Sequence, residues 1–180
     1  MHRTDRSGRL AGFCGRAVAA LACALLPLAL QAAEAGLQKV GEARLKVLFW
    51  SVYDSRLYAP GGEYDPGTRP LKLEIQYLRD ISAEALVRRT GKEWDALGLS
   101  HDLREEWLDK LRALWPDISQ NDRLAVELDA RSHATFFYNG KRLDTIADGD
   151  FGQSFVDIWL SPDTSRPDIR LALIGGTKPT

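Results

Sequence analysis

The segment Val47-Leu-Phe-Trp-Ser-Val-Tyr-Asp-Ser-Arg-Leu-Tyr58 decides how the rest of this chain is interpreted. It combines four aromatic rings, several aliphatic side chains and one arginine, a composition that predicts extended backbone rather than helix. Tyr53, Arg56 and Tyr58 carry polar tips that need partners if they are buried. Such a segment either lines a cavity or belongs to an ordinary core strand, and the residues alone leave both interpretations open.

The neighbouring residues predict further strands on both sides of this segment. Polar and apolar residues alternate over residues 42–49, which predicts a half-buried strand. Trp50 and Ser51 interrupt that alternation, so we expect a turn or bulge there, with a second strand over residues 52–58. Residues 59–70 are rich in proline and glycine and predict a loop, and the regular alternation of residues 71–77 predicts the clearest strand of the chain.

Two helices are predicted to follow. Ser82 is expected to cap the first, which carries an apolar stripe at helical spacing and ends at Gly98. Ser100 is expected to cap the second, which places His101 in its first turn and ends before Pro116. The stripes consist of Leu86, Thr90, Trp94 and Leu97 in the first helix and of Leu103, Trp107, Leu111 and Leu114 in the second.

The last third of the chain repeats the order of strands followed by helices. Alternation predicts a strand over residues 124–128, and Asn139-Gly140 predicts a tight hairpin between strands 134–138 and 141–146. Asp148 or Asp150 is expected to cap a helix that ends before Pro162, and Pro167 to open a short last helix through Ile174. This order predicts an α+β fold in which a mostly antiparallel sheet carries its helices on one face.

The first 33 residues have the layout of a secretory signal peptide. Arginines precede the apolar run of residues 17–30, and the small-residue sequence Ala33-Glu34-Ala35 follows it. We therefore expect residues 1–33 to be removed and residues 34–180 to form one domain, periplasmic or secreted. An uncleaved N-terminal anchor is the alternative. Cys14 and Cys23 both lie in the leader, so the mature domain would contain no thiol and no disulfide.

The composition of the remaining chain argues against several classes of function. Loss of residues 1–33 would leave 20 basic and 24 acidic side chains and no basic stripe, which disfavours nucleic acid as a partner. His101 and His133 stand far apart without other ligands at suitable spacing, so no metal site is expected, and no phosphate-binding loop or other cofactor motif is present. We therefore expect no metal and no cofactor.

A surplus of large aromatic side chains remains. Most must fill the core, but a sheet lined with aromatic rings under a helical layer can also enclose an apolar ligand. Arg56 could then anchor an acidic head group, or it could instead pair with an acid such as Asp54 or Glu74. The candidate ligand-binding residues are Tyr53, Arg56, Tyr58, Tyr77 and Trp159.

With these elements in order, the chain resembles the bacterial chalcone isomerase-like proteins. The resemblance implies an open-faced β-sandwich, in which a large antiparallel sheet lies under a helical layer with a ligand cleft between them. The residues that carry it are Gly41-Glu-Ala-Arg-Leu45, Phe49-Trp-Ser-Val-Tyr-Asp-Ser-Arg-Leu-Tyr58, Leu73-Glu-Ile-Gln-Tyr-Leu-Arg-Asp80, Asn139-Gly140 and Phe155-Val-Asp-Ile-Trp-Leu160.

The resemblance implies a fold more readily than an activity. Plant chalcone isomerases use an arginine, a threonine and a tyrosine around the cleft. With Val52 and Tyr53 as the point of alignment, the threonine position falls near Leu48 and the arginine position near Gly36. Without these two polar groups the means of stabilising a transition state is missing, whereas other members of the wider family bind fatty acids without catalysis.

Three hypotheses of function follow. The first is an exported, non-enzymatic binding protein for a small hydrophobic or fatty-acid-like ligand, with no membrane span once the leader is removed. The second is an isomerase of the chalcone isomerase type. The third is a structural or interaction module of the cell envelope, which would have a closed core and an exposed apolar patch around Trp107 or Trp115.

Overall fold

The computed structural model describes residues 36–176. Six strands form one antiparallel sheet whose spatial order follows the chain. Each neighbour is reached by a hairpin or by a connection that leaves the sheet and returns beside the strand it left. The strands are β1 (Leu37–Val47), β2 (Trp50–Pro60), β3 (Leu71–Tyr77), β4 (Arg123–Leu128), β5 (Ala134–Tyr138) and β6 (Lys141–Ile146).

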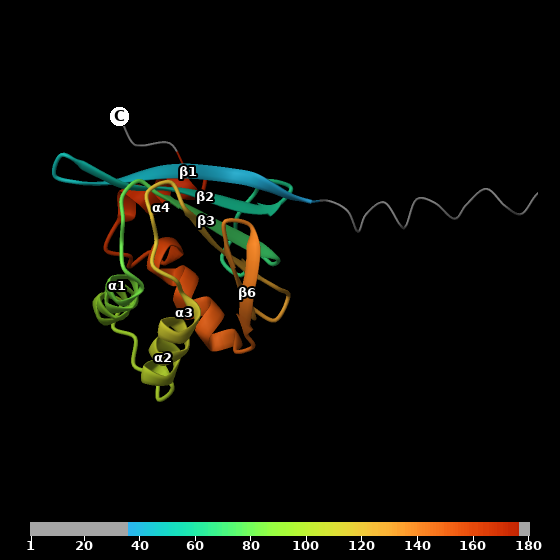
Figure 1. The fold of residues 1–180 in the computed structure, drawn as a ribbon. Helices are drawn as coiled ribbons and strands as arrows, with labels where there is room; N and C mark the ends of the chain where they lie inside the picture. Colours follow the sequence, from blue (N-terminus) through green and yellow to red (C-terminus); the bar gives the residue numbers. More distant parts are fainter. Residues whose placement is uncertain (1–35, 177–180) are drawn as a thin grey trace, which may run out of the picture. The chain divides into compact units, whose positions relative to one another are not determined.

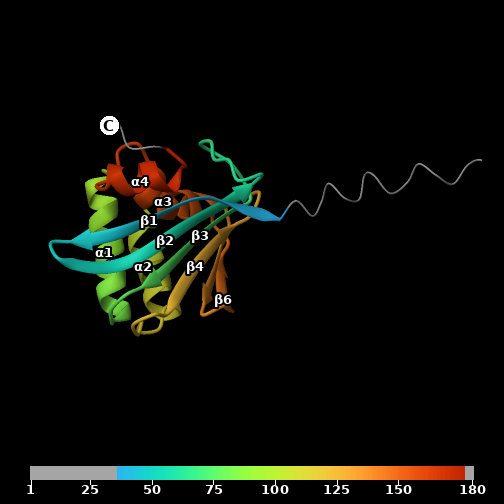
Figure 2. The same cartoon turned by 90° about the horizontal axis from the view of Figure 1, so that it is seen from above.

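Four helices cover one face of this sheet (Figure 1). Seen from above, the sheet lies in front of the helices and its other face carries no helical layer (Figure 2). The helices are α1 (Ala83–Ala96), α2 (Arg104–Leu114), α3 (Gly149–Leu160) and α4 (Pro167–Leu173). The predicted α+β class and the open-faced arrangement are therefore confirmed.

Alternation along the strands produces the two unequal faces. In β3 every second residue, from Leu71 to Tyr77, is buried beneath the helices, and the residues between them are only half buried. The helices add an aromatic layer to this core, in which Trp94, Trp107 and Phe151 are fully buried and meet edge to face. The core thus lies wholly between the sheet and the helices.

Several local predictions are confirmed by hydrogen bonds. The Ser82 hydroxyl accepts the backbone N–H of Ala85 at the start of α1. Asp148 caps α3 by accepting the N–H groups of Asp150 and Phe151. Asn139 and Gly140 connect β5 to β6, both with positive φ as a tight hairpin requires.

Two local predictions need correction. A turn or bulge was expected at Trp50 and Ser51; the turn between the first two strands falls earlier, at Leu48 and Phe49, and a bulge at Val52 directly follows Ser51. The apolar run continues through this turn, and Leu48 takes a positive φ of 54° without glycine or asparagine to mark it. The strand register shifts just before this turn, where Leu45 pairs with Tyr53 and Lys46 pairs with Ser51.

The start of the second helix is also later than predicted. Leu103, not Ser100, occupies the capping position of α2, and its side chain makes no capping hydrogen bond. His101 therefore precedes the helix, where its Nδ1 accepts the N–H of Leu103 at 3.1 Å. The imidazole fulfils part of the role expected of the serine, because it orders the turn that leads into the helix.

Candidate ligand-binding site

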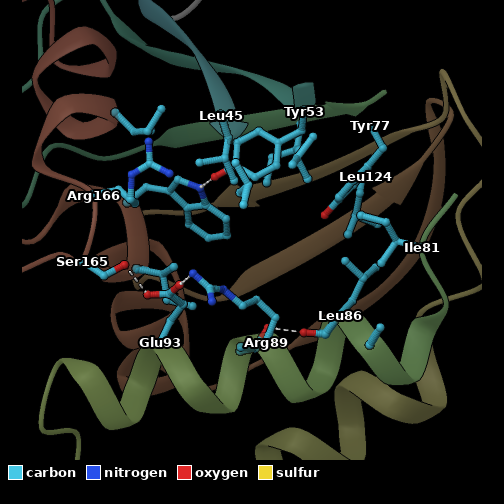
Figure 3. A pocket seen from close by; sticks show the side chains of 18 of the residues that line it. Leu45, Tyr53, Tyr77, Ile81, Leu86, Arg89, Glu93, Leu124, Ser165 and Arg166 are labelled. Atoms are coloured by element: carbon cyan, nitrogen blue, oxygen red, sulfur yellow. Dashed lines mark hydrogen bonds and ion pairs between the residues drawn. The ribbon is translucent and has the colours of Figure 1, made fainter. Parts of the chain in front are cut away.

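A cavity of about 340 Å³ lies between the sheet and helices α1 and α3 (Figure 3). Strands β1 to β4 supply its sheet side, and α1, α3, α4 and the segment before α4 supply most of the other side. The lining is mostly aliphatic and aromatic. This volume falls in the lower part of the range of roughly 300–1,000 Å³ that is usual for small-molecule sites.

Strand pairing places two tyrosines together on the sheet side of the cavity. Tyr53 of β2 stands opposite Tyr77 of β3, so both rings face the helices. Their centroids are 6.1 Å apart in an edge-to-face arrangement. The register shift after Leu45 turns Val52 toward the cavity beside Tyr53, which breaks the strict alternation of β2 at this point.

The Tyr53 hydroxyl joins the sheet to the helix layer. It accepts a 3.0 Å hydrogen bond from the indole Nε1 of Trp159 in α3. Burial is the main cause that raises the pKa of Tyr53 above its ordinary value. The phenol therefore stays neutral at physiological pH, and its own proton remains available to an acceptor in the cavity.

The Tyr77 hydroxyl points into the cavity (Figure 3). Tyr77 is only 5 % exposed. Its hydroxyl forms no hydrogen bond with another of residues 36–176. Burial raises the pKa of Tyr77 well above its usual range, with a smaller contribution from Tyr53. A buried, neutral hydroxyl without a protein partner is a donor that a ligand can satisfy.

Charged and hydroxyl groups gather at one end of the cavity (Figure 3). Glu93 of α1 is only 7 % exposed, forms an ion pair with Arg89 one helical turn earlier, and accepts the Ser165 hydroxyl at 2.6 Å. Arg166 lies beside them and donates two hydrogen bonds to Asp168, at 3.0 and 2.8 Å, which raise the pKa of the guanidinium. Each arginine at this end thus has an acidic partner, which an anionic ligand would have to share.

The structure brings three of the five candidate residues together. Tyr53, Tyr77 and Trp159 all line the cavity. Arg56 and Tyr58 do not, because they alternate with the buried Ser55 and Leu57 and so lie on the opposite face of β2.

On that open face, Arg56 forms ion pairs with acids of both neighbouring strands. Its Nη1 lies 3.4 Å from Glu74 of β3, and its Nε lies 3.7 Å from Glu42 of β1. Both acids stand directly opposite Arg56 in the strand register, so the arginine links three strands on this face.

The charged end of the cavity was not among the predicted site residues. A helical projection of α1 could have indicated part of this end. Arg89 and Glu93 are four residues apart, and they lie on the side of the helix that also carries the buried Leu86 and Thr90. An ion pair next to an apolar stripe indicates charge at the edge of a core. Nothing in the local pattern indicates Arg166, which reaches the site from the loop before α4.

The apolar patch of the interaction hypothesis is not where it was expected. Trp107 and Trp115 are both buried in the aromatic core. The large hydrophobic side chains that are exposed among residues 36–176 instead concentrate at the turn between β1 and β2. Leu48, the position that the resemblance aligns with a catalytic threonine, belongs to this turn and does not line the cavity.

Two further kinds of feature are absent from the described residues. No group of three or more histidine, cysteine or acidic side chains in residues 36–176 is arranged to hold a metal ion. Among the same residues, no helix combines the length and the apolar composition that crossing a bilayer requires.

Comparison with known proteins decides the family. The family model described as chalcone isomerase-like matches residues 21–175. The chain belongs to the chalcone isomerase-like family. A relative from Haemophilus influenzae, an uncharacterized protein, is 31% identical over 142 residues, which cover 78% of this chain and 69% of the relative.

A solved structure supports the same fold for this chalcone isomerase-like chain. The crystal structure of a fatty-acid binding protein from Arabidopsis thaliana matches with a TM-score of 0.60 over 77% of this chain and 87% of the plant protein. Sequence identity in that match is 13%, so the likeness concerns the fold.

Proposed function

We propose that this chalcone isomerase-like protein is an exported, non-enzymatic binding protein for a small hydrophobic or fatty-acid-like molecule. The observation that carries the proposal is the cavity, whose apolar lining ends in a cluster of charged and hydroxyl groups. An amphipathic ligand matches this division, with its hydrocarbon part among the aliphatic and aromatic side chains. The name of the Arabidopsis neighbour, a fatty-acid binding protein, supports the same class of ligand.

The polar groups suggest how such a ligand would be oriented. A carboxylate at the charged end would take hydrogen bonds from Arg166 or Arg89, and the Tyr77 hydroxyl would donate to a polar atom further inside. Glu93 stands at the same end and repels an anion, so the site holds a carboxylate less tightly than two free arginines would. Binding that is modest and reversible suits a carrier.

The test is displacement of a fluorescent fatty acid from the purified protein by a saturated fatty acid and by the alcohol of equal chain length. We expect displacement by both, with the acid binding more tightly. Failure of the fluorescent probe to bind at micromolar concentration would overturn the proposal. Incubation with a chalcone checks the isomerase hypothesis in parallel, since we expect its absorbance to decay at the rate in buffer.

Substitution of the acid at the charged end tests the orientation. Glu93→Gln removes the negative charge beside Arg89 and leaves a hydrogen-bonding group of nearly the same shape. We expect the fatty acid to bind about tenfold more tightly, which corresponds to about 1.4 kcal/mol, and the alcohol to bind unchanged. The control is Glu84→Gln on the same helix, outside the cavity lining, which should alter neither affinity.

Export is tested separately from binding. The leader pattern of residues 1–33 predicts that the protein recovered from the periplasm of its host begins close to Glu34. Intact mass measurement of that protein gives the answer directly. Recovery of the full-length mass from the cytoplasmic fraction would contradict export and leave the binding proposal standing.

A further inference from the structure

The turn between β1 and β2 exposes an uninterrupted run of large hydrophobic side chains, which we call the hairpin tip (residues 47–50). Val47, Leu48, Phe49 and Trp50 are 51, 86, 98 and 66 % exposed. Among the described residues, only Leu103 also counts as a large exposed hydrophobic side chain. Single exposed hydrophobic residues are ordinary, whereas four consecutive ones mark a contact surface.

The hairpin tip stands away from the rest of the domain. In both views the β1–β2 hairpin extends past the helical layer, and no helix covers its end (Figures 1 and 2). Leu48 adopts a φ of 54°, a conformation that asparagine or glycine would take at lower cost. Local conformation therefore does not explain the choice of Leu48 at this turn.

The hairpin tip is continuous with the cavity. Val47 is half exposed at the tip and also lines the cavity, together with Leu45 and Val52 of the same hairpin. Val47 pairs with Trp50 across the turn, so both side chains lie on the face of the hairpin that leads inward. An apolar surface thus runs from the end of the β1–β2 hairpin to the interior of the site.

Cationic side chains flank the hairpin tip. Lys46 precedes it and is exposed, and the Arg79 guanidinium lies 5.8 Å from the ring centre of Trp50. Among residues 36–176, neither Lys46 nor Arg79 takes part in an ion pair. Tryptophan beside lysine or arginine, next to fully exposed aliphatic and aromatic groups, is the composition of a protein surface at a membrane interface.

We propose that the hairpin tip inserts into the surface of a lipid bilayer with anionic head groups, and that the cavity takes up its ligand along this hairpin from the bilayer. The inference that the tip inserts is drawn from the exposed side chains alone. The inference that the ligand enters the cavity from the bilayer, which we call loading, rests on the proposed function. Leu48 and Phe49 enter the acyl region, Trp50 remains at the level of the head groups, and Lys46 and Arg79 contact lipid phosphates.

A lipid surface fits the hairpin tip better than a protein partner does. A stable protein interface buries about 800 Å² on each side and involves some 20–30 residues. Four side chains at the end of a narrow hairpin offer much less contact than that. Insertion into lipid needs only a few apolar groups together with nearby cations, and that is what this turn presents.

The experiment is flotation with vesicles of phosphatidylglycerol and phosphatidylethanolamine. The protein is purified from its host, and intact mass confirms that wild type and variants share one N-terminus. We expect wild type to float with these vesicles, and Leu48→Ser combined with Phe49→Ser to lower the partition coefficient at least tenfold. The control is Leu103→Ser, which removes the other exposed hydrophobic side chain and should float like wild type.

The outcomes separate insertion from loading and from ligand binding. Displacement of the fluorescent fatty acid in solution should be equal in wild type and in the double variant, whose thermal melting should also be unchanged. Transfer of the probe from donor vesicles should be slower in the double variant only. Absence of flotation by wild type, or equal flotation of the double variant, would overturn membrane insertion whatever the result of probe binding. A wild-type dimer that the double substitution dissociates, without flotation, would assign the hairpin tip to self-association instead.

Discussion

At the scale of single residues, Tyr53 and Tyr58 provide a matched pair. Both belong to β2, but Tyr53 accepts the Trp159 indole between sheet and helix, and Tyr58 lies on the open face. Tyr53→Phe leaves the indole N–H without its acceptor, so we expect the free energy of unfolding to fall by about 1–2 kcal/mol. Urea denaturation followed by circular dichroism measures this value.

The control for this prediction is Tyr58→Phe, which removes the same atom from the same strand. Its hydroxyl is not part of the contact between the layers, so we expect a change of less than about 0.5 kcal/mol, as is usual for substitutions at the surface. Equal losses in the two variants would show that the hydrogen bond to Trp159 contributes nothing beyond the general effect of losing a phenol.

The same two residues show how far sequence can predict the site. Alternation along β2 fixes that Tyr53 and Arg56 lie on opposite faces, because they are three residues apart. Alternation does not show which of the two faces the helices cover. Either residue could therefore face the cavity, and both were candidates. Glu93 and Arg166 meet only after α1 and the segment before α4 have packed, so their proximity depends on tertiary contacts that no local pattern contains.

At the scale of elements, the surroundings of two helical glycines lead us to expect opposite effects of substitution by alanine on stability. A Cβ at Gly152 of α3 would lie 1.8 Å from the carbonyl oxygen of Ser132, so the helix can approach the turn before β5 only without a side chain there. A Cβ at Gly91 of α1 would meet Leu108 at 3.5 Å, an ordinary contact.

Glycine to alanine in a helix is otherwise favourable by about 1 kcal/mol. We expect Gly91→Ala to keep or raise the melting temperature for this reason. Gly152→Ala must move α3 away from the Ser132 backbone, and we expect it to lose at least about 2 kcal/mol of stability. Differential scanning calorimetry of the two variants checks the contrast, and a Gly152→Ala protein as stable as wild type would contradict the close approach.

Elements with strong local signals were predicted correctly. Asn139 and Gly140 favour positive φ by themselves, and Ser82 and Asp148 supply their own capping oxygens, so these boundaries are encoded within a few residues. The turn at Leu48 and Phe49 carries no such residues, and its position follows from the pairing of two long strands. The error at this turn also coincides with the surface proposed to bind lipid, where local preference and the observed structure disagree.

At the scale of the whole molecule, the cavity that would bind a ligand also lowers the stability of the fold. Apolar atoms that line an unfilled space lose packing contacts, so the cavity lowers the stability of this domain relative to one in which side chains fill the same space. Ala85 of α1 lines this space, whereas Ala96 of the same helix is exposed. Alanine and leucine differ little in helix propensity, so leucine at each position isolates the effect of filling the cavity.

We expect Ala85→Leu to raise the free energy of unfolding by about 1–2 kcal/mol, because its added carbons become buried at roughly 0.8 kcal/mol each with some loss to imperfect fit. The same substitution should weaken binding of a long-chain fatty acid at least tenfold, since the side chain occupies part of about 340 Å³. Ala96→Leu should change neither quantity. Urea denaturation and probe displacement on the two variants measure both effects. Higher stability with undiminished affinity would place the ligand elsewhere, and lower stability would mean that the cavity is too rigid to accept a larger side chain.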